Sequence, residues 1–350
     1  MIENGAEVGG QCILRGCMPT KILLHAAEVL HHVNHYGRFG ISADNTGFDF
    51  AKVMERKDRF IEELAEDRRN QLGDGQFEFI RGHASFLDPH TVAVSNHGPL
   101  TAWHFIITTG STVAPPHLPQ LRETGNLTSD DALNLSELPK SLIILGGGAV
   151  AAEFAQFFAR FSVLVTVLRR SEHVLRDFDT DAAMESEKVF GHEGIDVFTN
   201  TELTDARHNG SLKTISFLHH GKPASVAAEE ILLALRREPN TAPLDLDKAG
   251  VVTERGRIVA NGFMHTSAPH IYTAGDCTGS HKIVHLAVQQ GETAGHNIAH
   301  PEIPRRMNDR LLLAAIFIEP QVTSVGLTEK AATSGGVPYL TASHPFSDHG

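Results

Sequence analysis

The chain has 350 residues, of which 41% are hydrophobic and 21% are charged, a composition typical of a soluble globular protein with more than one domain. Its formal net charge of −12 argues against broad binding to nucleic acid, which needs a basic surface. No apolar run is long enough to span a bilayer and no secretory signal follows Met1, so we expect a cytoplasmic protein without a membrane partner.

Two of the three cysteines lie close together near the start of the chain, in the segment Gly9-Gly10-Gln11-Cys12-Ile13-Leu14-Arg15-Gly16-Cys17-Met18-Pro19-Thr20-Lys21. In a regular α-helix, Cα atoms five residues apart are roughly 8–9 Å from each other. A disulfide tolerates no more than about 7 Å, so a bridge here needs a distorted turn, which Gly16 permits. Pro19 suits the first turn of a following helix, where a cysteine gains a lowered pKa. The alternatives are two unrelated buried cysteines, or a metal site, for which four ligands are not in sight.

The middle of the chain alternates helical and apolar segments, which predicts α/β architecture. Residues 52–72 form a charged amphipathic helix, residues 77–109 form several short strands, and a proline-rich linker follows at residues 114–119. The 22 histidines are scattered, and no cysteine or carboxylate stands at ligand spacing beside the adjacent pairs. We therefore expect no metal site.

A nucleotide-binding unit begins at residue 141. A buried strand at residues 141–145 runs into Gly146-Gly147-Gly148-Ala149-Val150-Ala151, a helix over residues 152–161 follows, and a second strand covers residues 163–168. This is G-x-G-x-x-G/A in its strand–turn–helix context, so Gly146, Gly148 and Ala151 are expected to line a dinucleotide pyrophosphate.

Basic residues end the second strand of this unit, where an NAD enzyme would carry an acidic one. Arg169, Arg170 and Arg176 can accommodate a ribose 2′-phosphate, because guanidinium groups bind phosphate in fork geometry. The alternative is a solvated basic turn. NADP is therefore the expected coenzyme, and NAD remains possible.

Farther along, a strand at residues 230–235 ends in Arg236-Arg237-Glu238-Pro239. Another buried strand, residues 271–274, runs into Gly275-Asp276, and a helix is expected over residues 285–297. A new strand-rich unit begins near residue 311.

The dithiol segment resembles the active-site signature G-G-x-C-x4-C-x-P-x-K of the class I pyridine nucleotide-disulfide oxidoreductases. The resemblance implies that Cys12 is the interchange thiol, that Cys17 is the charge-transfer thiol facing a flavin, and that Lys21 lies near flavin N5. It also implies that Glu153 pairs with Lys21 beside the nicotinamide. The other interpretation of Glu153 is a carboxylate that interacts with the helix dipole.

Further segments are similar to the FAD site of that family. Thr108-Thr109-Gly110-Ser111 resembles the turn that borders the flavin domain, and Tyr272-Thr273-Ala274-Gly275-Asp276 resembles its second FAD motif. Glu3 fits the acidic residue that holds the adenosine ribose. By the same resemblance the residues expected at the cofactors include Gly10, Ala84, Thr109, Gly110, Asp276 and Arg237. Arg236 departs from the family, which usually has glycine there.

The resemblance implies an α/β fold with two Rossmann-like domains, for FAD and NAD(P), and the start of an α+β dimerisation domain. The expected boundaries are residues 1–116 and 239–308 for the two parts of the FAD-binding domain, 117–238 for the NAD(P)-binding domain and 309–350 for the dimerisation domain. The family's glycine-rich FAD fingerprint and its His–Glu dyad are not in the sequence, so we expect a chain truncated at both ends.

The expected function is an FAD-dependent NAD(P)H:disulfide oxidoreductase. Hydride passes from NAD(P)H to FAD, then reduces the Cys12–Cys17 disulfide, and the dithiol reduces a small-molecule or protein disulfide or another thiol-reactive substrate. A homodimer is the expected assembly. The alternative is an inactive remnant of this family that still binds the nucleotide.

Overall fold

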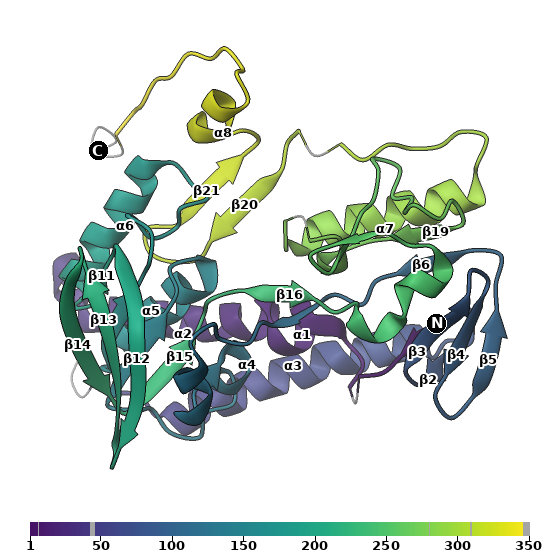
Figure 1. The fold of residues 1–350 in the computed structure, drawn as a ribbon. Helices are drawn as coiled ribbons and strands as arrows, with labels where there is room; N and C mark the ends of the chain where they lie inside the picture. Colours follow the sequence, from purple (N-terminus) through teal and green to yellow (C-terminus); the bar gives the residue numbers. More distant parts are fainter. Residues whose placement is uncertain (6, 43–45, 280, 309, 346–350) are drawn as a thin grey trace.

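The computed structural model describes residues 1–5, 7–42, 46–279, 281–308 and 310–345, which form two lobes bridged by long helices and a pair of strands (Figure 1). Within these ranges no helix is both long enough and apolar enough to cross a membrane.

One lobe is built on a five-stranded parallel sheet in the order β11-β10-β9-β15-β8. Its strands are β8 (Leu127–Thr128), β9 (Ser141–Leu145), β10 (Leu164–Leu168), β11 (Asp196–Phe198) and β15 (Glu230–Leu233). Alternate residues of β9 enter two separate core clusters, Leu142 and Ile144 on one face and Ile143 and Leu145 on the other. Both faces of β9 are therefore buried, which explains its uninterrupted apolar sequence.

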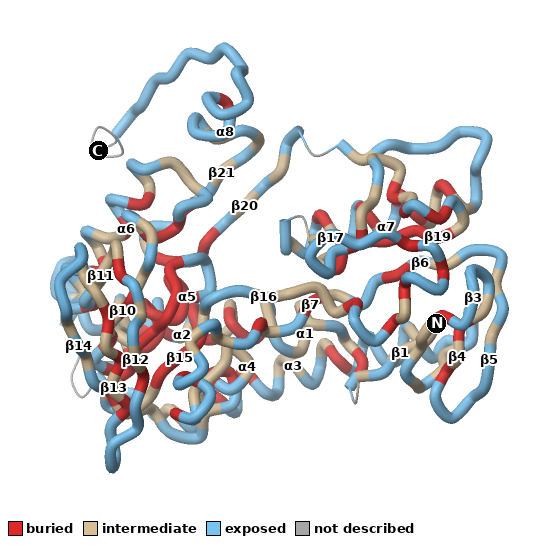
Figure 2. The backbone as a smooth tube through the Cα atoms, viewed as in Figure 1, coloured by how far each residue is buried: buried red, intermediate tan, exposed pale blue. Residues whose placement is uncertain are grey.

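Helices and a second sheet cover the two faces of this parallel sheet (Figure 2). The lobe's helices are α4 (Ser129–Ala132), α5 (Ala149–Arg160), α6 (Thr180–His192) and the 3-10 turn η2 (Pro119–Glu123). An antiparallel meander, β12 (Thr201–Asn209), β13 (Leu212–His219) and β14 (Lys222–Ala228), contributes Ile215 and Phe217 to the second cluster. This meander was not predicted from the sequence.

The other lobe contains short paired strands around its own core. Parallel pairs join β1 (Ile2–Glu3) to β2 (Ile80–Arg81) and β6 (Phe105–Ile107) to β19 (Ile271–Thr273). An antiparallel sheet holds β3 (Ala84–Asp88), β4 (Thr91–Val94) and β5 (Gly98–Thr101). The remaining elements of this lobe are β17 (Thr253–Glu254), β18 (Arg257–Ile258), the turns η3 (Ala242–Leu244), η4 (Leu246–Ala249) and η5 (Asp276–Thr278), and helix α7 (Val284–Ala299).

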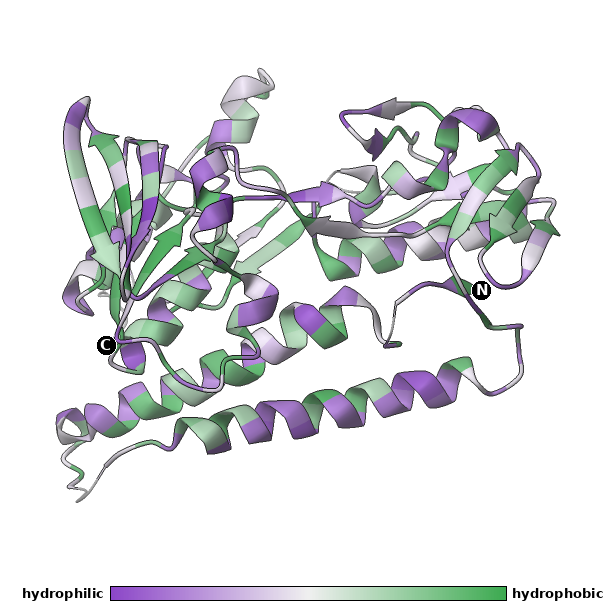
Figure 3. Cartoon of the chain, turned by 60° about the horizontal axis from the view of Figure 1, so that its bottom comes forward, coloured by the Kyte–Doolittle hydropathy of each residue, from purple (hydrophilic) through white to green (hydrophobic). Residues whose placement is uncertain are grey.

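Three helices lie along the side of the molecule and span both lobes: α1 (Gly10–Arg15), α2 (Cys17–Asn34) and α3 (Phe50–Leu72), with the turn η1 (Tyr36–Phe39) after α2. Asp49 caps α3 by accepting a hydrogen bond from the backbone N–H of Lys52 at 3.3 Å. Figure 3 shows α3 along the edge of the molecule with hydrophilic and hydrophobic residues interspersed, and Met54, Lys57 and Ala65 are its buried residues, which confirms the amphipathic helix expected there.

The lobes are also joined by β7 (Ser111–Val113) and β16 (Arg237–Pro239), which pair in antiparallel fashion where the chain leaves one lobe and returns to it. The last elements are β20 (Leu313–Ile316), β21 (Val322–Val325) and α8 (Glu329–Ser334). The β20–β21 connection packs Ile316 and Ile318 into the core cluster that contains α2 and α5.

Candidate active site

The two neighbouring cysteines lie on different helices. Cys12 is in α1 and Cys17 is the first residue of α2, with Gly16 between them. A Cβ atom at Gly16 would lie 3.0 Å from the carbonyl oxygen of Gln11 and 3.5 Å from the Cα of Cys12. The helix therefore breaks at a position where a side chain would be crowded, which confirms the expected distorted turn. Both cysteines are half-buried free thiols in this structure.

The two thiols differ in acidity. The pKa of Cys17 is lowered from 9.0 to about 6, first because its sulfur accepts a hydrogen bond from the Cys12 thiol and also because of the Lys21 ammonium group. Burial and the Glu153 carboxylate oppose this shift. The pKa of Cys12 is raised, first because its thiol is the hydrogen-bond donor to Cys17 and second by burial. At neutral pH the pair is a thiolate on Cys17 and a thiol on Cys12.

An ion pair connects the dithiol helix to the nucleotide-binding lobe. Lys21 Nζ donates hydrogen bonds to both carboxylate oxygens of Glu153, at 2.7 Å and 2.9 Å. Glu153 is the fifth residue of α5 and only 4% exposed. The expected proximity of Lys21 and Glu153 is confirmed, and a simple helix-dipole role for Glu153 does not explain its burial or its partner.

The turn between β9 and α5 has the shape of a nucleotide site. Gly146 has φ +141°, and a Cβ there would lie 2.2 Å from the carbonyl oxygen of Ala234, just after β15. The turn thus lies where the ends of β9 and β15 meet, the crevice in which open α/β sheets bind ligands. Ala151 is buried in the first turn of α5.

Arg169 packs over this turn. A Cβ at Gly147 would come within 2.5 Å of Arg169 Cδ, and Arg169 Nε is the one buried side-chain nitrogen or oxygen in the described ranges that lacks a hydrogen-bond partner. Burial, and next the charge of Arg176, lower the pKa of Arg169. Two guanidinium groups near a glycine turn, one with an unsatisfied N–H, fit a phosphate-bearing dinucleotide. Arg170 and Arg176 have exposed side chains.

Arg237 belongs to a different group of residues. It donates to the hydroxyl of Ser111 at 3.0 Å and to the carbonyl of Ser111 at 2.9 Å, and Ser111 Oγ donates to Asp276 Oδ2 at 2.6 Å. Lys282 Nζ donates to the carbonyl oxygen of Arg237 at 2.7 Å. The structure therefore places Arg237 with Asp276 and not with Arg169.

The remaining expected flavin residues lie at the ends of short strands and helices. Glu3 ends β1 and accepts a hydrogen bond from the N–H of Gly5 at 2.8 Å, and Ala84 begins β3. Gly10 and Gly110 have φ +70° and +68°, and no atom lies within 4 Å of a Cβ built at either position. Thr109 accepts from Asn240 Nδ2 at 3.4 Å. Open backbone at these glycines fits the approach of a bound cofactor such as FAD.

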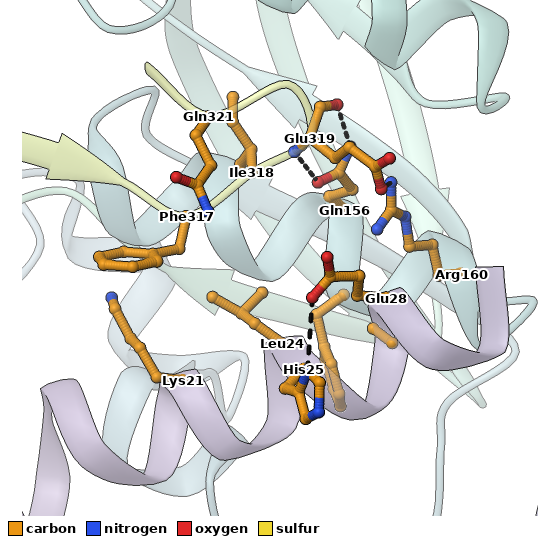
Figure 4. Close-up of a pocket in the computed structure, with 12 residues that line it drawn as sticks. Lys21, Leu24, His25, Glu28, Gln156, Arg160, Phe317, Ile318, Glu319 and Gln321 are labelled. Carbon is orange, nitrogen blue, oxygen red and sulfur yellow. Dashed lines mark hydrogen bonds and ion pairs between the residues drawn. The ribbon is translucent and has the colours of Figure 1, made fainter. Parts of the chain in front are cut away.

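A cavity of about 260 Å³ opens beside Lys21, between α2, α5 and the β20–β21 connection (Figure 4). Leu24, Ala27, Phe157 and Ile318 give it apolar walls, and Glu28, Arg160, Glu319 and Gln321 contribute polar groups. Across the described ranges, no group of three or more histidine, cysteine, aspartate or glutamate side chains could hold a metal ion.

Two contributors to these sites were not predicted from the sequence. Ser111 was seen only as part of a turn, although it connects Arg237 to Asp276. Phe317 lay within the expected dimerisation domain, residues 309–350, without an assigned role, although its backbone N–H donates to Glu153 Oε1 at 3.1 Å. Phe317 and Glu153 are 164 residues apart, so no local sequence signal could have shown their contact.

Comparison with known proteins gives a consistent assignment. Residues 1–291 match the family model described as pyridine nucleotide-disulphide oxidoreductase. Mercuric reductase of Staphylococcus aureus is 31% identical over 348 residues, covering 99% of this chain and 63% of that protein. Dihydrolipoyl dehydrogenase of Geobacillus stearothermophilus is 32% identical over 356 residues, covering 100% of this chain and 74% of that protein.

A solved structure shares the fold. The HOCl-induced flavoprotein disulfide reductase RclA of Escherichia coli superposes with a TM-score of 0.84 at 30% identity, covering 96% of this chain and 73% of that one. The chain spans less than two thirds of the Staphylococcus aureus mercuric reductase and 55% of the one from Bacillus cereus. Fold, dithiol and matched sequence together show that this chain belongs to the pyridine nucleotide-disulfide oxidoreductase family.

Proposed function

We propose that this chain carries the redox centre of an FAD-dependent, NADPH-linked disulfide reductase. The observation that carries the proposal is the bidentate hydrogen bond of Lys21 to Glu153. It links the helix that begins at Cys17 to the helix that begins at the glycine-rich turn, so the dithiol and the nucleotide turn belong to one site.

A bound flavin supplies the electron transfer between nicotinamide and disulfide. In the overall reductive step, NADPH and one proton convert the Cys12–Cys17 disulfide into two thiols and release NADP⁺. Cys17 then loses its proton near pH 6, and Lys21 stabilises the thiolate. The residues proposed to hold the flavin are Glu3, Gly10, Ala84, Thr109, Gly110 and Asp276. The hydrogen bonds from Arg237 to Ser111 and from Ser111 to Asp276 support this role for Asp276.

In the proposed thiol–disulfide exchange, Cys12 reacts with the substrate first and Cys17 reacts second. The Cys12 thiol passes its proton to the Cys17 thiolate, to which it is hydrogen-bonded, and the resulting Cys12 thiolate attacks one sulfur of the substrate disulfide. A mixed disulfide forms, and the departing substrate thiolate takes the proton from Cys17. The Cys17 thiolate then attacks the Cys12 sulfur, releases the second substrate thiolate and restores the Cys12–Cys17 disulfide. The substrate is proposed to be a small-molecule or protein disulfide, or another thiol-reactive compound.

The coenzyme is proposed to be NADPH, because the Arg169 guanidinium lies over Gly147 with an unsatisfied Nε and Arg176 is close enough to lower its pKa. The protein is proposed to act as a homodimer in the cytoplasm. Exposed apolar side chains in and after β20–β21, namely Leu313, Val325 and Leu327, support such an assembly.

The test is spectroscopic. The purified chain should be yellow from bound flavin, and NADPH should produce a long-wavelength band from charge transfer between the Cys17 thiolate and the flavin. The band should be lost in Cys17→Ser and retained in Cys277→Ser, since Cys277 is fully buried and distant in sequence from the dithiol. A chain that binds NADPH without flavin would support the inactive remnant and contradict the proposal.

A further inference from the structure

The segment that follows β20 reaches the Lys21–Glu153 pair from a third direction. The backbone N–H of Phe317 donates to Glu153 Oε1 at 3.1 Å, and Lys21 Nζ lies 4.7 Å from the centre of the Phe317 ring. Figure 4 shows the lysine side chain pointing toward that ring at the edge of the cavity. Phe317 had no role predicted from the sequence, and the proposed reaction does not use it.

These contacts restrict where the ammonium group can be. Glu153 accepts hydrogen bonds from Lys21 and from the Phe317 backbone, and it is only 4% exposed, so its carboxylate is held in place. The ring attracts the ammonium group because the face of an aromatic ring is electron-rich. Side-chain exposure of 33% leaves Lys21 free to turn toward solvent if either contact is removed.

We propose that Phe317 is a positioning residue, whose ring and backbone N–H hold Lys21 and Glu153 in the arrangement that tunes the Cys17 thiol. The functional meaning of this role rests on the proposed function. Its physical content concerns only residues of this chain and can be measured without flavin or nucleotide.

The position of Lys21 matters because two opposite charges act on Cys17. The groups that affect Cys17 are the Cys12 thiol from α1, the Lys21 ammonium from α2 and the Glu153 carboxylate from α5. Lys21 lowers the pKa of Cys17 and Glu153 raises it. If the ring is lost, the ammonium group can move into the adjacent cavity while Glu153 stays held by the backbone N–H, so the balance shifts toward the thiol form.

The experiment measures the pH dependence of iodoacetamide alkylation at Cys17 in the reduced chain, with the site read by mass spectrometry. Phe317→Leu fills the space without an aromatic face, and we expect the Cys17 pKa to rise by about half a unit. Phe317→Tyr keeps the face and should retain the wild-type profile. In the Lys21→Met background, Phe317→Leu should cause no further change.

Two results would overturn the inference: an unshifted profile in Phe317→Leu, or the same shift with and without Lys21. Phe39→Leu is the matched control, because Phe39 is 70% exposed in η1 and should leave the Cys17 profile unchanged. If Phe317→Leu does not fold, as judged by its urea midpoint, Phe317→Met replaces it with the same expected shift.

This measurement separates the two proposals. If the Phe317 variants show the expected alkylation shifts but the wild-type chain shows no NADPH-dependent reduction of flavin, the proposed function is contradicted and the role of Phe317 stands. Normal flavin reduction with unchanged alkylation profiles would contradict only the role of Phe317.

Discussion

Cys12 and Cys17 carry the same side chain, yet the structure shifts their pKa values in opposite directions. The Cys12 thiol donates a hydrogen bond to Cys17, which raises the pKa of the donor and lowers that of the acceptor. The Lys21 ammonium adds to the acidity of Cys17. The assignment of an interchange thiol and a thiolate facing the flavin, which the family resemblance implied, agrees with this difference.

The first prediction concerns the stability of the reduced chain as pH changes. The pKa of Cys17 is lowered from 9.0 to about 6 in the folded chain, so between these pH values the unfolded chain binds more protons and the Cys17 contribution to stability grows with pH. The contribution is fully present above pH 9 and is lost as the pH falls through 6. Urea midpoints in excess reductant should therefore diverge between wild type and Cys17→Ser as pH rises from 6 to 8. Parallel curves would contradict it.

The second prediction concerns the helix break. Gly16→Ala should lower the free energy of unfolding by about 1–3 kcal/mol, because the added Cβ meets the Gln11 carbonyl oxygen at 3.0 Å. Gly37→Ala is the control, since a Cβ at Gly37 has no atom within 4 Å and its cost should stay within about 0.5 kcal/mol. Urea denaturation of both variants provides the measurement, and equal midpoints would show that Gly16 tolerates a side chain.

Among the elements, the segments with strong periodicity were predicted well from the sequence. The expected helix over residues 52–72 is α3 (Phe50–Leu72), and the expected strand–turn–helix is β9 followed by α5, which starts three residues earlier than expected, at Ala149. The turn residues themselves form the first turn of the helix, because alanine and valine after Gly148 are good enough helix formers to begin it there.

Elements and contacts that depend on distant partners were not predictable. In the meander β12–β14, polar and apolar residues alternate, and the apolar ones cover one face of β9 and β15. The contact of Phe317 with Glu153 depends on how β20 crosses α5, which no local pattern contains. The sequence alone did not show that Arg237 has Ser111 as its partner, because the two residues are 126 positions apart.

The third prediction tests the glycine-rich turn. Gly146→Ala should destabilise the protein by more than about 2 kcal/mol, because its Cβ would overlap the Ala234 carbonyl oxygen and its φ is +141°. Gly148→Ala meets no neighbouring atom and should fold normally, yet it should weaken NADPH binding because the pyrophosphate must approach the turn closely. Calorimetric titration of folded Gly148→Ala with NADPH gives the answer, and unchanged affinity would place the nucleotide elsewhere.

At the scale of the whole molecule, a polar network fastens the β20–β21 connection to α5. Arg160 pairs with Glu193 and with Glu319, each at 2.8 Å, and Gln156 exchanges hydrogen bonds with the backbone of Glu319 at 2.7 Å and 2.9 Å. The side chains of Arg160 and Glu193 are 6% and 13% exposed, whereas that of Glu319 is 44% exposed. The two ion pairs therefore differ in how much their loss should cost.

The fourth prediction follows from that difference. Arg160→Met leaves the Glu193 carboxylate buried without its cation, and we expect the free energy of unfolding to fall by about 3 kcal/mol. Glu319→Gln removes a partner that water can replace, so its cost should stay below about 1 kcal/mol. Thermal or urea unfolding of both variants measures the difference, and a larger loss for Glu319→Gln would contradict this ranking.

One core cluster contains both Leu23, Leu24 and Ala27 of α2 and Phe154, Phe157 and Phe158 of α5. A hinge motion that opened the crevice by separating these helices would expose this aromatic and aliphatic contact to water, which makes the motion costly. We therefore expect the distance between the dithiol and the nucleotide turn to stay nearly constant. The Lys21 side chain, which is 33% exposed, can change rotamer without separating these helices, so we expect access to the dithiol to depend on side-chain rotation and not on movement of whole lobes.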